Sequence, residues 1–156
     1  GTVEQGQVID LHEQNIPNDD RPFIGNIRED WDHVRNGISS ILRSNPSLSY
    51  RPEDVYAEVI SGQALYWKTP EGFVISTTEV DPYTGGKTFL VWLAWANEKG
   101  NKNVLRYYPF FRQVAAESGY EALEVRTNVS KMESILVNAG WVKDHVVYRL
   151  GVQDGQ

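Results

Sequence analysis

The chain has 156 residues, of which 40% are hydrophobic and 23% charged, as is usual for one globular domain with a sizeable core. Its formal net charge of −6 argues against general nucleic-acid binding, and no apolar run approaches the ~20 residues of a membrane span. Cysteine is absent, which excludes disulfides and thiolate metal sites, and the first residues lack the regions of a signal peptide. We therefore expect an acidic, cytoplasmic protein with neither a membrane span nor a nucleic-acid partner.

Residues 1–26 are polar and differ in composition from the rest of the chain. Gln, Glu, Asp, Asn and Gly dominate there, and Pro17 and Pro22 interrupt any regular pattern. Two interpretations stay open: a mobile tail, or a segment that becomes ordered on a partner protein chain or a neighbouring subunit of a homo-oligomer. We predict an extended arm over 1–26, one domain over 27–150 and a polar tail over 151–156.

Two helices are predicted at the start of the domain. Apolar residues at helical spacing predict the first over Glu29–Arg43, with Pro46 just beyond its end. The second is predicted over Pro52–Ile60, because a proline at the first turn with acidic residues beside it is a good start signal. Gly62 is well placed to end it.

Three strands in a meander follow the helices. They are predicted over Ala64–Trp67, Phe73–Val80 and Lys87–Ala96, with turn-forming residues between them. Nearly every residue of the third strand is apolar, which suits a strand that is covered on both faces.

A helix and a further strand come next. After a polar loop, a helix is predicted over Val104–Ser118, ended by Gly119, and a strand over Glu121–Thr127. A connection of this size predicts that Thr88–Ala96 and Ala122–Thr127 pair in parallel through a right-handed crossover.

The last predicted elements are a helix and a strand. Ser130 and Glu133 have the spacing of a capping box, and the helix that they begin ends at Gly140. A last strand is predicted over Trp141–Leu150.

This order of elements, with Asn128 after the fifth strand and Gly140-Trp141 after the last helix, resembles the GNAT family of acetyl-CoA-dependent N-acyltransferases. The resemblance covers about residues 27–150. It implies an α+β fold with a mixed, mostly antiparallel sheet, helices on both faces and a parallel strand pair that splays into a cleft. It also implies acetyl-CoA or CoA as the cofactor if the chain is active. The overall pattern is similar, too, to small GNAT-like proteins of tailed bacteriophages, some of them virion components.

The resemblance places the CoA pyrophosphate at the loop before Val104–Ser118. Family members bind it with backbone N–H groups at a helix N-terminus, where small residues let the backbone close on the phosphates. Those positions fall here on Gly100, Asn103 and Leu105, and the branched Leu105 departs from the pattern. Pro109 also departs, because it removes a backbone donor and predicts a kink or a helix that starts only near that residue.

Cations surround the same loop. Lys99, Lys102 and Arg106 could hold a phosphate without the glycines, or they form a solvated basic loop. The candidate cofactor-binding residues are Lys99, Gly100, Lys102, Asn103, Val104 and Asn128.

The catalytic residues of the family are poorly matched. Its proton donor to the leaving thiolate is commonly a Tyr at the position of Leu136, and a leucine cannot donate a proton. The remaining candidates are Tyr107, Tyr108 and Tyr148, and Glu79 or Glu124 as a base toward an amine, unless these two face solvent. The histidines lack ligand spacing, so no metal site is expected.

Two functions follow from these patterns. The departures at Leu105 and Leu136 and the polar arm favour a GNAT-fold domain that does not catalyse and serves in binding or structure. The alternative is an acetyltransferase in which an amine attacks the thioester directly, without an acylated residue.

Overall fold

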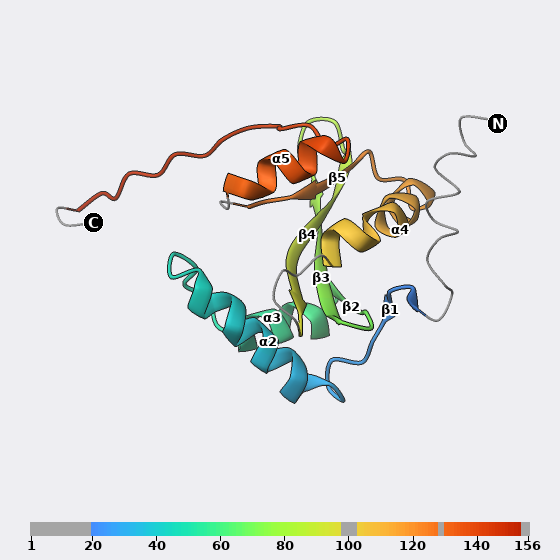
Figure 1. Cartoon of the computed structure of the whole chain (residues 1–156), viewed down its shortest axis with the longest axis vertical. Coiled ribbons are helices and arrows are strands. Elements are labelled where there is room, and N and C mark those ends of the chain that lie inside the picture. The colour runs from blue at the N-terminus through green and yellow to red at the C-terminus, as the bar shows by residue number, and fades with distance from the viewer. Residues whose placement is uncertain (1–19, 98–102, 128–129, 154–156) are drawn as a thin grey trace. The chain divides into compact units, whose positions relative to one another are not determined.

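The computed structural model describes residues 20–97, 103–127 and 130–153 (Figure 1). Contacts divide the chain into two compact units, Gly1–Arg126 and Thr127–Gln156. Over the described residues, the first unit holds a five-stranded sheet and three helices, and the second holds one helix. Residues 1–19 lie outside this description, so most of the predicted arm and its protein partner stay a prediction.

The elements of the first unit closely match those predicted. They are β1 (Phe23–Ile24), α2 (Trp31–Ser44), α3 (Pro52–Ile60), β2 (Ala64–Lys68), β3 (Gly72–Val80), β4 (Lys87–Ala96), α4 (Asn103–Glu117) and β5 (Ala122–Val125). Only β1 was not predicted, because its two residues lie in the polar arm and are too few for an alternating pattern to appear. They pair with Lys68 and Trp67 at the edge of the sheet.

The strands lie in the order β1-β2-β3-β4-β5. All neighbours are antiparallel except β4 and β5, which pair in parallel from Thr88 opposite Ala122 to Val91 opposite Val125. The helix α4 connects these two strands. The predicted parallel pair and the mixed, mostly antiparallel sheet are therefore confirmed, and the fold is the GNAT fold.

Helices cover both faces of this sheet. Alternate residues of β3 point to opposite faces, so Phe73 and Ile75 pack with α2 and α3 while Val74 packs with α4. The first core cluster also contains Val34, Ile38, Val55, Tyr66 and Leu93, and the second also contains Trp67, Phe89, Val91, Tyr107 and Phe111.

The helix α4 runs without interruption past Pro109. It begins at Asn103, so the predicted late start near Pro109 is wrong. Proline removes one backbone hydrogen bond, but Tyr107 and Phe111, on either side of it, are fully buried against the sheet and stabilise the helix. Gly119 follows with φ 80°, a left-handed conformation that glycine adopts without strain and that ends the helix as predicted.

The second unit consists of α5 (Ser130–Asn138) and the segment that follows it. Gly140, with φ 98°, ends the helical turns, and the Trp141 N–H bonds back to the Leu136 carbonyl at 3.0 Å. The predicted strand over Trp141–Leu150 is wrong for the single chain, because these residues form no ladder with any described strand. A strand needs a partner for its backbone groups, and none is supplied here.

Candidate functional site

The ladder between β4 and β5 ends partway along β4. Thr88–Val91 pair with β5, whereas Trp92–Ala96 extend beyond Val125, the last residue of β5. A bulge lies at the same place, because the register between β3 and β4 skips Trp92. The two parallel strands therefore separate from Trp92 onward, which confirms the predicted splayed pair.

An aromatic pair stands at this bulge. The ring centroids of Trp92 and Tyr50 lie 5.6 Å apart, and Tyr50 comes from the connection between α2 and α3. Burial raises the pKa of the Tyr50 hydroxyl above its ordinary 10.0, and hydrogen bonding with the Trp92 side chain acts in the opposite direction. Neither residue was singled out from the sequence, although together they line the point where the strands part.

The first turns of α4 carry a network of charges. The Arg106 guanidinium bonds to the Glu71 carboxylate and lies 3.4 Å from an oxygen of Asp20. The Tyr107 hydroxyl donates to the same Glu71 carboxylate, at 2.9 and 3.1 Å to its two oxygens. Arg106 also lies over the Tyr107 ring, 5.1 Å from its centroid. Arg106, one of the three cations that the sequence offered to a phosphate, is thus bound by two carboxylates of the chain itself.

The three tyrosines that we considered as proton donors have different surroundings. Tyr107 is fully buried, and burial, then its bond to Glu71, raises the pKa of its hydroxyl, so it holds its proton firmly. Tyr148 is 90% exposed, and Tyr108 is half-buried in α4. Leu136, at the family's donor position, is buried in the second unit. No tyrosine is therefore assigned this role.

The two candidate bases come together at one guanidinium. Arg126 donates to Glu79 at 2.6 Å and to Glu124 at 3.3 Å, so β3 and β5 are bridged at their surface. These ion pairs raise the pKa of Arg126, with the Glu79 hydrogen bond as the largest cause. Both glutamates that the sequence offered as bases are thus engaged in ion pairs with one arginine.

Most candidate cofactor contacts lie where the structure describes little. Lys99, Gly100, Lys102 and Asn128 are outside the described residues, and Asn103 and Val104 are described only as the start of α4. Leu105 is half-buried in the first turn of that helix. The predicted cofactor loop therefore stays a prediction, while its neighbour Arg106 is placed by the contacts above.

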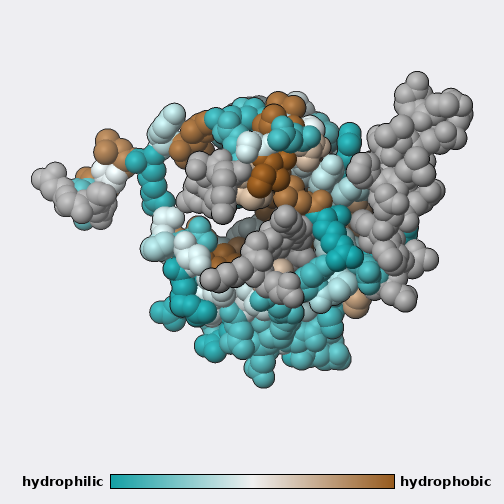
Figure 2. Space-filling model, viewed as in Figure 1, coloured by the Kyte–Doolittle hydropathy of each residue, from teal (hydrophilic) through white to brown (hydrophobic). Residues whose placement is uncertain are grey.

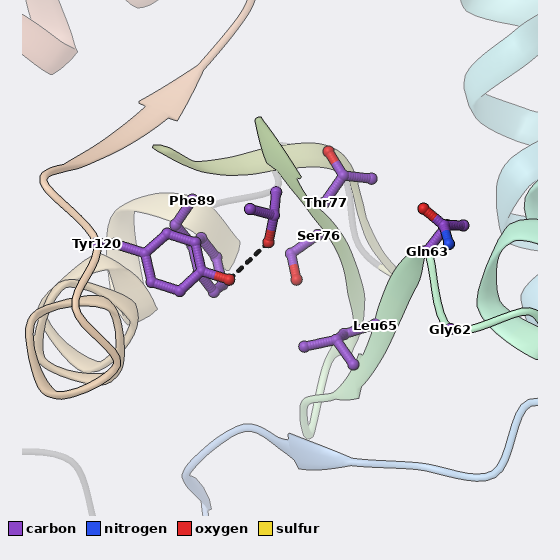
Figure 3. Close-up of a pocket in the computed structure, with 8 residues that line it drawn as sticks. Gly62, Gln63, Leu65, Ser76, Thr77, Phe89 and Tyr120 are labelled. Carbon is purple, nitrogen blue, oxygen red and sulfur yellow. Dashed lines mark hydrogen bonds between the residues drawn. The ribbon is translucent and has the colours of Figure 1, made fainter. Parts of the chain in front are cut away.

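A separate cavity of about 210 Å³ lies against β2 and β3 (Figure 3). Its lining residues are Gly62, Gln63, Leu65, Ser76, Thr77, Thr78, Phe89 and Tyr120. Two of the hydroxyl groups are held by bonds within the chain: Ser76 accepts from Trp67 at 2.9 Å, and Thr78 bonds to Tyr120 at 2.6 Å. None of the described residues that line the cavity is charged, so these side chains supply neither a carboxylate base nor a cation for an anion.

The described residues contain no group of three or more His, Asp or Glu side chains that could hold a metal ion. None of their helices is long and apolar enough to cross a membrane.

Comparison with known proteins relates the chain to acetyltransferases by fold. It is similar to the solved structure of a probable acetyltransferase, with 14% identity over 86% of this chain and 99% of that one and a TM-score of 0.64. A putative acetyl transferase from Pyrococcus furiosus has 11% identity, coverage of 85% and 100%, and a TM-score of 0.63. A ribosomal-protein-alanine N-acetyltransferase from Brucella melitensis biovar Abortus 2308 has 17% identity, coverage of 83% and 98%, and a TM-score of 0.59.

Comparisons of sequence add nothing to this relation. No protein-family model and no curated protein sequence matches the chain. Identities this low show a common fold and leave the activity open.

Proposed function

We propose that this chain is a GNAT-fold domain that serves as a binding or structural protein and does not transfer acetyl groups. One observation carries the proposal: Glu71 and Asp20 occupy the Arg106 guanidinium in the first turns of α4. In the GNAT cofactor mode, the negative pyrophosphate belongs at this helix N-terminus. Arg106 and these two carboxylates together carry a net charge of about −1, so this guanidinium is less available to a phosphate than an unpaired one would be.

The catalytic positions support the same function. Leu136 stands where the family's acid would be, and Arg126 holds both candidate bases. The proposed role is in the host cytoplasm or within an assembly such as a phage virion, as the resemblance to phage proteins suggests.

The second candidate function is an acetyl-CoA-dependent N-acetyltransferase. The separation of β4 from β5 at Trp92 favours it, because a cleft between parallel strands can receive an extended ligand. The solved acetyltransferases of the same fold also favour it. The amine would attack the thioester directly, so no acylated residue is required.

Calorimetric titration with acetyl-CoA separates the two functions. We expect no binding isotherm for the unmodified chain up to ~1 mM, a concentration at the upper end of ordinary enzyme KM values. Micromolar binding, or release of free thiol from acetyl-CoA in the presence of amines, would establish the enzyme instead.

Two variants with the same change of charge test whether the carboxylates on Arg106 prevent CoA binding. Glu71→Gln removes one of the two carboxylates that bind Arg106 and leaves Asp20, whereas Glu53→Gln removes an exposed carboxylate from a different ion pair, with Arg35. We expect Glu71→Gln to gain acetyl-CoA affinity over the unmodified chain and Glu53→Gln to gain none. Equal behaviour of the two folded variants would show that the carboxylates are not the obstacle. Leu105→Gly, compared in the same titration, measures the steric obstacle separately.

A further inference from the structure

The cavity against β2 and β3 has a buried base and an exposed rim. Ser76 and Phe89, which line it, are only 2% and 3% exposed, whereas Leu65 is 44% exposed. Figure 3 shows the Ser76 hydroxyl, the Leu65 side chain and the Tyr120 ring facing a common space. A molecule from solution can therefore enter past Leu65 and reach the Ser76 hydroxyl.

The Ser76 hydroxyl has a proton without an acceptor. The indole N–H of Trp67 is only a donor, so the Ser76 oxygen must be the acceptor in the 2.9 Å bond between them. The described residues supply no acceptor for the proton of the hydroxyl itself. Among them, Ser76 is also the only buried serine, threonine, amide or charged residue. Buried polar groups nearly always have partners, so this donor points to an occupant of the cavity.

The other walls determine the chemistry of that occupant. Leu65 and the rings of Phe89 and Tyr120, whose centroids lie 5.7 Å apart, provide apolar contacts. The Lys87 ammonium does not line the cavity: it lies over the Tyr120 ring, 4.6 Å from its centroid, and donates to the Ser118 carbonyl at 3.2 Å. An ion that entered would lose water without gaining a counter-charge from the lining side chains, so the cavity favours a neutral molecule.

The size of the cavity limits the occupant further. Its volume is about 210 Å³, below the ~300 Å³ at which pockets for drug-sized ligands begin. An engineered apolar cavity of about 150 Å³ in another protein binds benzene, so this one has room for a six-membered ring with one polar group. The apolar walls also distinguish it from the outer side of α2, where Figure 2 shows mostly hydrophilic side chains.

We propose that this cavity is a binding site for a small neutral molecule that carries a hydrogen-bond acceptor on an apolar ring or chain. The acceptor receives the Ser76 proton, and the apolar part packs between Leu65 and the two rings. None of the lining residues belongs to the Arg106 network or to the bulge at Trp92, so this proposal holds whether or not CoA binds.

Titration of the full chain with cyclohexanone, followed by proton–nitrogen NMR, tests the site. Cyclohexanone carries a carbonyl acceptor on a six-membered apolar ring. We expect the Trp67 indole N–H resonance, which reports on the Ser76 oxygen, to shift and to saturate with a Kd of ~1 mM, an ordinary value for so small a ligand. Cyclohexylammonium has the same ring with a charge and no acceptor, and we expect it to bind at least about tenfold more weakly. No saturable shift with cyclohexanone, or equal binding of the two probes, would overturn the proposal.

Three variants test the position of the ligand. Leu65→Trp narrows the cavity, whereas Leu48→Trp makes the same change at an exposed leucine that does not line it. We expect the first to weaken cyclohexanone binding at least about tenfold and the second by less than about twofold. Ser76→Ala removes the donor and should weaken binding about fivefold. Equal affinities of the two leucine variants would overturn the proposal, as would a folded Ser76→Ala that binds as tightly as the unmodified chain.

Discussion

The bond between Tyr107 and Glu71 gives the sharpest test of the network in the first turns of α4. Tyr107 is fully buried, and its hydroxyl donates to a carboxylate that also binds Arg106. Tyr107→Phe keeps the ring and removes only this hydroxyl. Hydrogen bonds to charged groups contribute about 1.5–3 kcal/mol, so we expect the free energy of unfolding to fall by ~2 kcal/mol. For a domain of this size that lowers Tm by about 4–8 °C.

Tyr120→Phe is the matched control. The Tyr120 hydroxyl also bonds to another side chain, Thr78, but both partners are neutral and the pair is exposed. We expect a loss below about 1 kcal/mol, which is typical of a neutral hydrogen bond. Urea unfolding followed by tryptophan fluorescence measures both variants under the same conditions.

The pH dependence of the free energy of unfolding gives a second test of the Tyr107–Glu71 hydrogen bond. Burial and Glu71 raise the pKa of Tyr107 above its unfolded value of 10.0, so the folded chain holds the proton more tightly than the unfolded chain. The stabilisation is therefore complete below pH 10 and falls as the pH rises beyond it, by at most about 1.4 kcal/mol per unit. The difference between the unmodified chain and Tyr107→Phe should shrink over that range. A Tyr107→Phe loss no larger than that of Tyr120→Phe, with no change above pH 10, would refute the reasoning.

Two other substitutions test the packing and charges around α2. Gly37→Ala should destabilise by about 1–3 kcal/mol despite alanine's higher helix propensity, because its Cβ would lie 2.6 Å from the Phe73 ring, whereas the exposed Asn36→Ala should not. Thermal melts of the two variants decide this, and equal Tm values would contradict it. For Asp30, burial raises the pKa, but hydrogen bonds from Lys68 and Tyr66 outweigh it and hold the pKa below 3.8. Its stabilisation is present above pH 3.8 and lost as the pH falls through the folded value, so Asp30→Asn should cost most near neutrality and little below pH 3. A cost that does not depend on pH, measured by urea unfolding, would show that this ion pair is unimportant.

Local sequence patterns predicted most of the helices and strands, because the ends of these elements depend on residues that are close together in the sequence. The bounds Pro52–Ile60 and Lys87–Ala96 match the structure, since a first-turn proline and an unbroken apolar run are strong local signals. The parallel pairing of β4 and β5 followed from the length of the connection between them, through the crossover rule.

The candidate site could be predicted only in part, because its contacts join distant residues. Glu71 meets Arg106 across 35 positions of sequence, and no local pattern selects it over other turn residues. The bulge at Trp92 likewise depends on distant residues, because it arises from the register between β3 and β4. Amino-acid composition does not reveal this register. Arg106 was one of three cations that suggested a phosphate contact, and in the structure two carboxylates bind its guanidinium.

The segment after α5 shows that the preference of a segment for a strand conformation and its pairing with another strand are different properties. The alternating pattern and the β-branched residues of Trp141–Leu150 favour a strand. This preference is a property of one segment. Pairing is a property of two segments, because each backbone N–H and C=O of a strand needs a partner at a fixed spacing. Trp141–Leu150 have the first property and form no ladder among the described strands. The strand prediction failed there because it was made from the pattern of one segment, which does not specify a pairing partner.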